Sequence, residues 1–190
     1  MQDRLSNSCR QLSSMVDQLT DTHGETLIQI GHQLVEIFTR GGQLVLVGNG
    51  PLQAIAQQIA TAFSHRLGFE RPPLPAVALG SNPIFSSALL ADHRQQEILT
   101  REYRIYSERE HMLLIFCGEN PSPQISHLLE QIEDTRALVL IGPADKDREK
   151  KAQPALRLKL SGESPARLAE LGLICGHLIC ELVEGELFGV

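Results

Sequence analysis

Short apolar segments that each end in glycine recur along the middle of the chain. They are QLVLVG (43–48), LPAVALG (74–80), MLLIFCG (112–118) and ALVLIG (137–142), and a helix-compatible stretch follows each of them. Apolar runs that alternate with helices predict a parallel sheet with both faces covered. A fifth segment, ALRLKL (155–160), alternates apolar and polar positions and predicts an edge strand. The pattern therefore predicts an α/β fold, a three-layer αβα sandwich.

Near both ends of the chain, apolar residues recur at the spacing of a helix. Residues 2–20 and 25–40 read as two helices, because Asp21-Thr22-His23-Gly24 interrupts the apolar spacing. Residues 165–188 predict one long terminal helix, and small residues form a stripe along it: Ala169, Gly172, Gly176 and Cys180. A glycine inside a helix costs about 1 kcal/mol relative to alanine. We therefore expect the stripe to pack closely, either within the core or across a subunit interface.

Length and composition limit the classes of protein that fit. At 190 residues the chain is expected to form a single domain, 1–190, with residues 1–40 as a helical extension and residues 41–190 as the αβα core. The net charge of −6 argues against a primary role on nucleic acid. No apolar stretch approaches the roughly 18 residues of a membrane span. The four cysteines lack metal-ligand spacing, which favours reduced thiols, a cytoplasmic location and no bound metal.

The turn after the first strand, Gly48-Asn49-Gly50, is the most informative motif. A strand that turns directly into a helix leaves free backbone N–H groups at a helix N-terminus, which form a cradle for phosphate or another anion. The third glycine of the dinucleotide fingerprint is missing and there is no Walker lysine pattern, so no nucleotide cofactor is expected. Pro51 and Leu52 follow the turn, where such cradles usually carry a small hydroxyl residue or glycine. These two residues argue against phosphate.

Several other residues are open to two interpretations. His177 could be a general base, although a lone histidine on an apolar helix is more often a core or interface residue. Asp92 could face a ligand cleft or cap a helix, and Ser122 could contact phosphate or cap the next helix. Cys117 is interpreted as buried and inert. Glu119, in the same turn, would repel an anion.

The chain also carries an apolar pair close to its C-terminal end. Leu187 and Phe188 follow three glutamates within eight residues. Such a pair either docks onto the body of the protein or forms an exposed contact patch for a partner.

A series of landmarks, taken in order, resembles the SIS (sugar isomerase) domain family. The branch it resembles holds phosphoheptose isomerase and the DnaA initiator-associating protein. The landmarks are GGQLVLVGNG (41–50), ERPPLPAVAL (70–79), Ala91-Asp92, MLLI (112–115), Ala166-Arg167 and ELVEGELF (181–188). The resemblance extends nearly end to end. It implies a flavodoxin-like αβα sandwich that assembles as a homotetramer, with N- and C-terminal helices at the interfaces.

The resemblance also implies where the phosphate of a sugar phosphate would lie. In the isomerases of this family it is held by a serine after the GNG turn and by a Ser-Thr-Ser-Gly-Asn-Ser loop. Leu52 stands at the position of that first serine. Cys117, Gly118 and Glu119 replace the first three hydroxyl residues of the loop, and Ser122 matches its final serine.

The catalytic positions of the family are only partly present. The catalytic glutamate of the isomerases falls where this chain has Thr61-Ala62, whereas His177 matches the catalytic histidine. In the isomerases, two positions on the last helix contact metal and substrate. Ala169 and Gly172 occupy these positions here. An acid/base pair and a phosphate anchor are therefore not retained as a set.

We expect from this a non-catalytic scaffold that binds the replication initiator DnaA. Leu187 and Phe188 match a terminal pair that contributes to initiator binding in that branch. The alternative is a sugar-phosphate isomerase or sensor that uses His177, Asp92, Ser122 and the Gly48–Gly50 turn. A third possibility is a paralogue that co-assembles with a related SIS tetramer.

Overall fold

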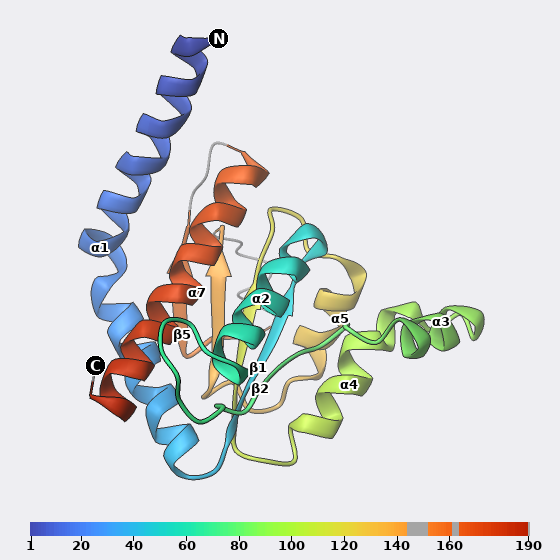
Figure 1. The fold of residues 1–190 in the computed structure, drawn as a ribbon. Coiled ribbons are helices and arrows are strands. Elements are labelled where there is room, and N and C mark those ends of the chain that lie inside the picture. The colour runs from blue at the N-terminus through green and yellow to red at the C-terminus, as the bar shows by residue number, and fades with distance from the viewer. Residues whose placement is uncertain (144–151, 161–163, 190) are drawn as a thin grey trace.

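The computed structural model describes residues 1–143, 152–160 and 164–189, and their strands form one parallel sheet (Figure 1). The strands are β1 (Gln43–Gly48), β2 (Ala76–Ala78), β3 (His111–Phe116), β4 (Leu138–Gly142) and β5 (Leu156–Lys159). Their order across the sheet is β2-β1-β3-β4-β5, and every pairing is parallel. The predicted α/β fold is confirmed, and β5 is the predicted edge strand.

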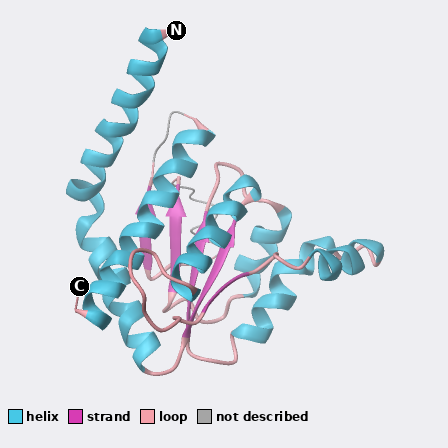
Figure 2. Cartoon of the chain, viewed as in Figure 1, coloured by secondary structure: helices cyan, strands magenta, loops and turns pink. Residues whose placement is uncertain are grey.

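Helices cover both faces of the sheet (Figure 2). They are α1 (Gln2–Thr39), α2 (Gln53–Ser64), α3 (Pro83–Ala91), α4 (Ile98–Tyr106), α5 (Pro123–Gln131) and α7 (Pro165–Phe188), with short 3₁₀ turns η1 (Gly50–Leu52) and η2 (Gln95–Glu97). Side chains alternate along each strand. In β1, Leu44 and Leu46 therefore pack under α1, α2 and α7, whereas Val45 and Val47 pack under α4 and α5.

The prediction of two N-terminal helices was wrong, because α1 continues from Gln2 to Thr39 without a break. Leu19 and Leu27, on either side of the expected interruption, are both buried. The His23 side chain reaches the backbone carbonyl of Lys159 at 3.2 Å. Packing of α1 along α7 and β5 thus outweighs the cost of Gly24, which is about 1 kcal/mol.

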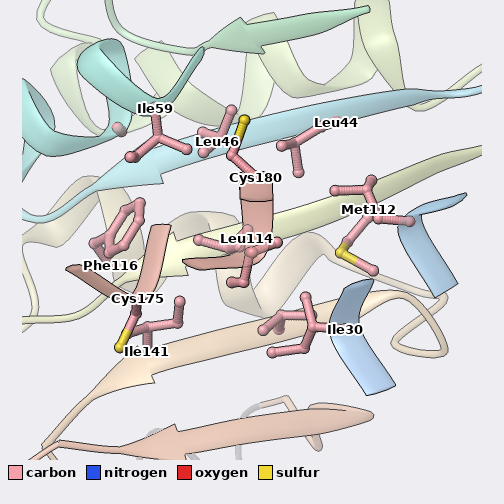
Figure 3. Close-up of a cluster of buried hydrophobic side chains, with 14 of the residues drawn as sticks. Ile30, Leu44, Leu46, Ile59, Met112, Leu114, Phe116, Ile141, Cys175 and Cys180 are labelled. Atoms are coloured by element: carbon pink, nitrogen blue, oxygen red, sulfur yellow. The ribbon is translucent and has the colours of Figure 1, made fainter. Parts of the chain in front are cut away.

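The stripe of small residues on α7 packs into the core, and its member Cys180 lies in the buried apolar cluster drawn in Figure 3. A Cβ atom at Gly176 would lie 2.5 Å from Ile59 of α2, and one at Gly172 would lie 3.4 Å from the ring of Phe116 in β3. Cys180 is fully buried in the same cluster. The core interpretation of the stripe is therefore confirmed for these three positions, which let α7 lie close to α2 and the sheet.

A buried ion pair joins the loop after α2 to the last turns of α7. The Arg71 Nε atom lies 2.6 Å from Glu184 Oε1, and both side chains are almost completely inaccessible. The same guanidinium donates to the carbonyl oxygens of Ala62 and Phe63 at the end of α2, at 2.8 and 2.9 Å. Removing one partner of such a pair typically costs about 3–5 kcal/mol. Arg71 therefore fixes the C-terminal ends of two helices together.

The apolar pair at the end of α7 lies against the body of the protein. Leu187 and Phe188 are half-buried and pack on the main core cluster. The Phe188 ring meets the Phe69 ring edge-on at 6.0 Å, and Arg71 lies 5.9 Å from the centre of the Phe188 ring. The docked arrangement, one of the two interpretations of this pair, is the one observed.

None of the helices in residues 1–143, 152–160 and 164–189 has the length and apolar character needed to cross a bilayer.

Candidate functional site

The strand order places a crevice between the carboxyl ends of β1 and β3. The chain leaves β1 into α2, which covers one face of the sheet, and leaves β3 into α5, which covers the other. Ligands of open α/β sheets bind at such a switch point. Two turns border it here, residues 48–52 after β1 and residues 117–122 after β3. The predicted ligand-binding residues Gly48, Asn49, Gly50 and Ser122 all belong to these turns.

The side chain of Asn49 joins the two turns across this crevice. Its Nδ2 atom donates to the backbone oxygen of Asn120 at 2.6 Å, and its Oδ1 atom accepts from the backbone N–H of Ser122 at 2.8 Å. Asn49 is only 9% exposed. A Cβ atom at Gly118 would lie 2.7 Å from Asn49 Nδ2. The absence of a side chain at position 118 is therefore what leaves room for the Asn49 carboxamide.

The backbone amides of the first turn are already hydrogen-bonded within the protein. The N–H of Gly48 donates to Gln53 Oε1 at 3.0 Å, that of Asn49 to the Phe116 carbonyl at 2.9 Å, and that of Leu52 to the Asn49 carbonyl at 3.2 Å. Pro51 has no N–H to offer. An anion cradle requires backbone N–H groups that are free to donate. In this five-residue turn, three N–H groups already donate to acceptors within the protein.

A glutamine side chain extends this closed network toward β2. Gln53 Nε2 donates to the carbonyl of Leu79 just after β2, while its Oε1 atom receives the Gly48 N–H. One turn further along α2, Gln57 Nε2 donates to Ser81 Oγ at 3.0 Å. Ser81 Oγ in turn donates to the Ala78 carbonyl at 2.8 Å. The strand-end carbonyls on this side of the crevice are thus also satisfied.

Leu52 and Glu119, the two residues that argued against phosphate in the sequence, have different positions in the structure. The Leu52 side chain is only 6% exposed and belongs to the core cluster on the α2 face of the sheet, so it does not fill the crevice. Glu119 is exposed at the rim of the second turn. The crevice is occupied by Asn49 instead, a role that the sequence pattern did not indicate.

Ser122 has the capping role that was one of its two interpretations. Its Oγ atom accepts the N–H of Ile125 at 3.3 Å and begins α5. Asp92 ends α3 and is exposed, outside the hydrogen-bonded network around Asn49. The structure therefore brings Gly48, Asn49 and Ser122 together and leaves Asp92 apart from them.

His177, the candidate general base, is half-buried on α7. Within the described ranges its ring forms no hydrogen bond or ion pair with a carboxylate that could orient it. The cysteines offer no nucleophile in this region, because Cys117 is buried and burial raises the pKa of both Cys175 and Cys180 to about 12. Across residues 1–143, 152–160 and 164–189, no three His, Cys, Asp or Glu side chains are grouped as metal ligands.

A cleft of about 1020 Å³ lies at the opposite, amino-terminal edge of the strands, and its lining includes no residue of the two turns. Two of its arginines pair with carboxylates of the same cleft: Arg40 with Glu110 at 3.0 Å and Arg136 with Asp134 at 2.6 Å. The hydrogen bond from Arg136 lowers the pKa of Asp134 to about 2. Sequence reasoning did not find this cleft, because its walls come from three segments far apart in the chain.

Comparisons with known proteins agree with this architecture. No family model matches the chain. A phosphoheptose isomerase from Burkholderia pseudomallei is 27% identical over 165 residues, which cover 86% of this chain and 83% of the relative. One from Alkalilimnicola ehrlichii is 24% identical over 186 residues, or 96% of this chain and 92% of the relative.

Solved structures show the same likeness at the level of the fold. The phosphoheptose isomerase from Francisella tularensis superimposes with a TM-score of 0.83 at 19% identity, covering 95% of this chain and 96% of that one. The phosphoheptose isomerase GmhA from Neisseria gonorrhoeae gives 0.81 at 18% identity, covering 97% and 98%. The chain thus has the α/β fold of these phosphoheptose isomerases. It is phosphoheptose isomerase-like in both sequence and structure.

The Asn49 bridge leads to a prediction about stability. Replacing Asn49 by alanine removes two hydrogen bonds and leaves the Ser122 N–H without its acceptor, so the free energy of unfolding should fall by about 1–3 kcal/mol. Asn120→Ala is the matched control, because Asn120 contributes only its backbone oxygen and its side chain is exposed. Urea unfolding of both variants measures the difference. Equal stability of the two variants would show that the bridge contributes nothing.

Proposed function

We propose that this chain is a non-catalytic, phosphoheptose isomerase-like protein that acts as an oligomeric interaction scaffold. The observation that carries the proposal is the closed network at the switch point. The Asn49 carboxamide occupies the crevice, and the N–H groups of Gly48, Asn49 and Leu52 are bonded internally. Opening this network for a phosphate would cost the hydrogen bonds that now hold the two turns together.

The positions expected to carry catalysis support the same proposal. An aldose–ketose isomerase moves a proton with a positioned acid/base group. In the SIS resemblance that group falls at Thr61-Ala62. Here the Thr61 hydroxyl donates to the backbone carbonyl of Gln57 at 2.9 Å, and Ala62 is buried. His177 would have to act without the partner that the family pattern supplies.

The first half of α1 supports assembly into the expected homotetramer. This segment stands away from the sheet (Figure 1). Leu5, Leu12 and Met15 recur along it at helical spacing; Leu5 is 66% exposed and the other two are half-buried, whereas Leu19 further along is buried in the core. The end of a helix that projects beyond its domain is marginal in water when it stands alone. A second copy of the chain, packed along this projecting part, would cover Leu5.

The partner in this proposal is the replication initiator DnaA, as the resemblance to the initiator-associating branch implies. Leu187 and Phe188 are the proposed contact. They are docked but only half-buried, so their outer edges remain accessible in the single chain. Four such small contacts on one tetramer would add avidity to a weak individual affinity.

The alternative is a sugar-phosphate isomerase or sugar-phosphate sensor. It is favoured by the relatives, since the reported ones are phosphoheptose isomerases. In this alternative the Gly48–Gly50 turn and Ser122 would hold the phosphate after Asn49 withdraws, and Asp92 and His177 would meet the sugar. Co-assembly with a related SIS tetramer is compatible with either role.

An isomerase assay separates the two functions. With sedoheptulose 7-phosphate as substrate, the purified protein should show no turnover above the protein-free rate, because no acid/base pair is assembled. His177→Ala is the control, since loss of a working general base lowers turnover about 10²–10⁴-fold. Turnover by the wild type that His177→Ala abolishes would replace the scaffold proposal by the isomerase.

A capture experiment tests the partner. Immobilised wild-type protein should retain DnaA, and Leu187→Ala should retain several-fold less, because the apolar contact is truncated. Glu181→Ala, an exposed position on the same helix, is the matched control, and thermal melting checks that both variants are folded. The DnaA assignment is wrong if the wild type retains no initiator. The Leu187 contact is wrong if all three proteins retain it equally.

A further inference from the structure

The cleft at the amino-terminal edge of the strands has the dimensions of a small-molecule site. Its volume is about 1020 Å³, whereas ligand pockets usually measure roughly 300–1,000 Å³ and have mostly apolar walls with a few polar groups. Ile37, Leu113 and Leu138 line the cleft and are buried, which gives it an apolar floor. Charged and polar side chains surround this floor. The chemistry of these side chains decides which kind of molecule fits.

Three helices of the described chain end at this cleft. Its lining includes Arg40 just after α1, Ser107 just after α4 and Gln131 at the end of α5. Helices α1 and α4 both descend to the lower edge of the domain in Figure 1. The C-terminal end of a helix carries a partial negative charge, which attracts a cation. The three helix ends therefore favour a positively charged group, such as an ammonium, in the cleft.

A hydrogen-bond acceptor of fixed orientation lies beside these helix ends. His111 Nδ1 lies 2.8 Å from the carbonyl oxygen of Arg109, which can only accept, so Nδ1 of the neutral ring carries the proton. The other ring nitrogen, Nε2, then accepts the hydroxyl proton of Tyr103 across 2.9 Å. Burial, and then the charge of Asp134, raises the pKa of Tyr103, so the phenol stays protonated at neutral pH. The lone pairs of the Tyr103 oxygen are therefore left for a donor such as an ammonium.

The rim of the cleft carries charged groups of both signs. Glu108 and Glu133 are exposed, and neither side chain forms an ion pair or hydrogen bond with another described residue. Arg109 is also exposed and has no carboxylate partner within the described ranges. Arg104 donates one long hydrogen bond, of 3.4 Å, to Gln131 Oε1. Two carboxylates and two guanidinium groups are thus available to a ligand, in addition to the ion pairs that line the same cleft.

We propose that this cleft binds a zwitterionic small molecule, either an apolar α-amino acid or a dipeptide of such residues. The guanidinium groups of Arg104 and Arg109 hold the carboxylate, because their paired N–H donors match its two oxygens. The ammonium lies toward Glu108, Glu133 and the Tyr103 oxygen, near the helix ends. The apolar side chain covers the floor of the cleft. A ligand of one charge would meet groups of its own sign at the rim, which repel it.

Isothermal titration calorimetry of the purified protein tests the class of ligand, with compounds that share one apolar body. L-leucine carries both charges, isoamylamine lacks the carboxylate, and isocaproate lacks the ammonium. L-leucine should bind about tenfold more tightly than either analogue, because only L-leucine makes both sets of charge-assisted hydrogen bonds. L-leucyl-L-leucine is titrated in parallel, and the tighter zwitterion identifies the source, free amino acid or peptide. Equal affinity for zwitterions and analogues, or no heat of binding from either zwitterion at millimolar concentration, overturns the proposal.

Substitutions at the rim locate the binding. Arg109→Ala and Glu133→Gln should each weaken the tighter zwitterion several-fold, because each removes the partner of one ligand charge. Arg4→Ala and Glu119→Gln are the matched controls, since both residues are exposed and outside the cleft, and they should bind as the wild type does. If both rim variants bind as tightly as the controls, with circular dichroism showing all four folded, the cleft assignment is overturned. The cleft shares no residue with the crevice or the proposed partner contact, so these outcomes are independent of the proposed function.

Discussion

The carboxamide of Asn49 links the two turns on which the carboxyl edge of the sheet depends. It donates to the Asn120 carbonyl in the turn after β3 and accepts from the N–H of Ser122, the residue that caps α5, and so ties the end of β1 to the turn after β3. Two glycines make this arrangement possible. A Cβ atom at Gly48 would lie 2.2 Å from the Leu52 carbonyl oxygen, and one at Gly118 would meet Asn49 itself. The sharp turn after β1 and the Asn49 side chain that bridges the two turns thus both require glycine, at positions 48 and 118.

The elements that depend on local pattern could be predicted from the sequence. Apolar runs located the five strands that the described residues form, the alternating run identified β5 as an edge, and the terminal helix was placed over its full length. The break in α1 was wrong because a single glycine weighs less than the contacts that a long helix makes on both sides of it. Local spacing carries no information about those contacts.

The structure has the glycine turn at the carboxyl edge of the sheet, as the sequence predicted, whereas ligand binding by its residues stays a prediction. The glycine turn correctly located the switch point, since any parallel sheet places strand ends there. What occupies the crevice depends on contacts between residues more than 70 positions apart, such as Asn49 with Asn120. The same holds for Arg71 and Glu184, which are 113 positions apart. A fold shared with phosphoheptose isomerases therefore does not decide the chemistry, because chemistry depends on the residues at the site.

The most direct test of a closed crevice is a nuclear magnetic resonance titration that follows the backbone amides of Gly48 and Ser122. Sedoheptulose 7-phosphate and inorganic phosphate are added separately to the isotope-labelled protein. Because both amides are bonded to protein acceptors, their signals should stay unchanged up to concentrations far above those at which enzymes bind such substrates. Saturable shifts of both signals, with no change at an exposed amide such as that of Glu181, would contradict the account and place a sugar phosphate in the crevice.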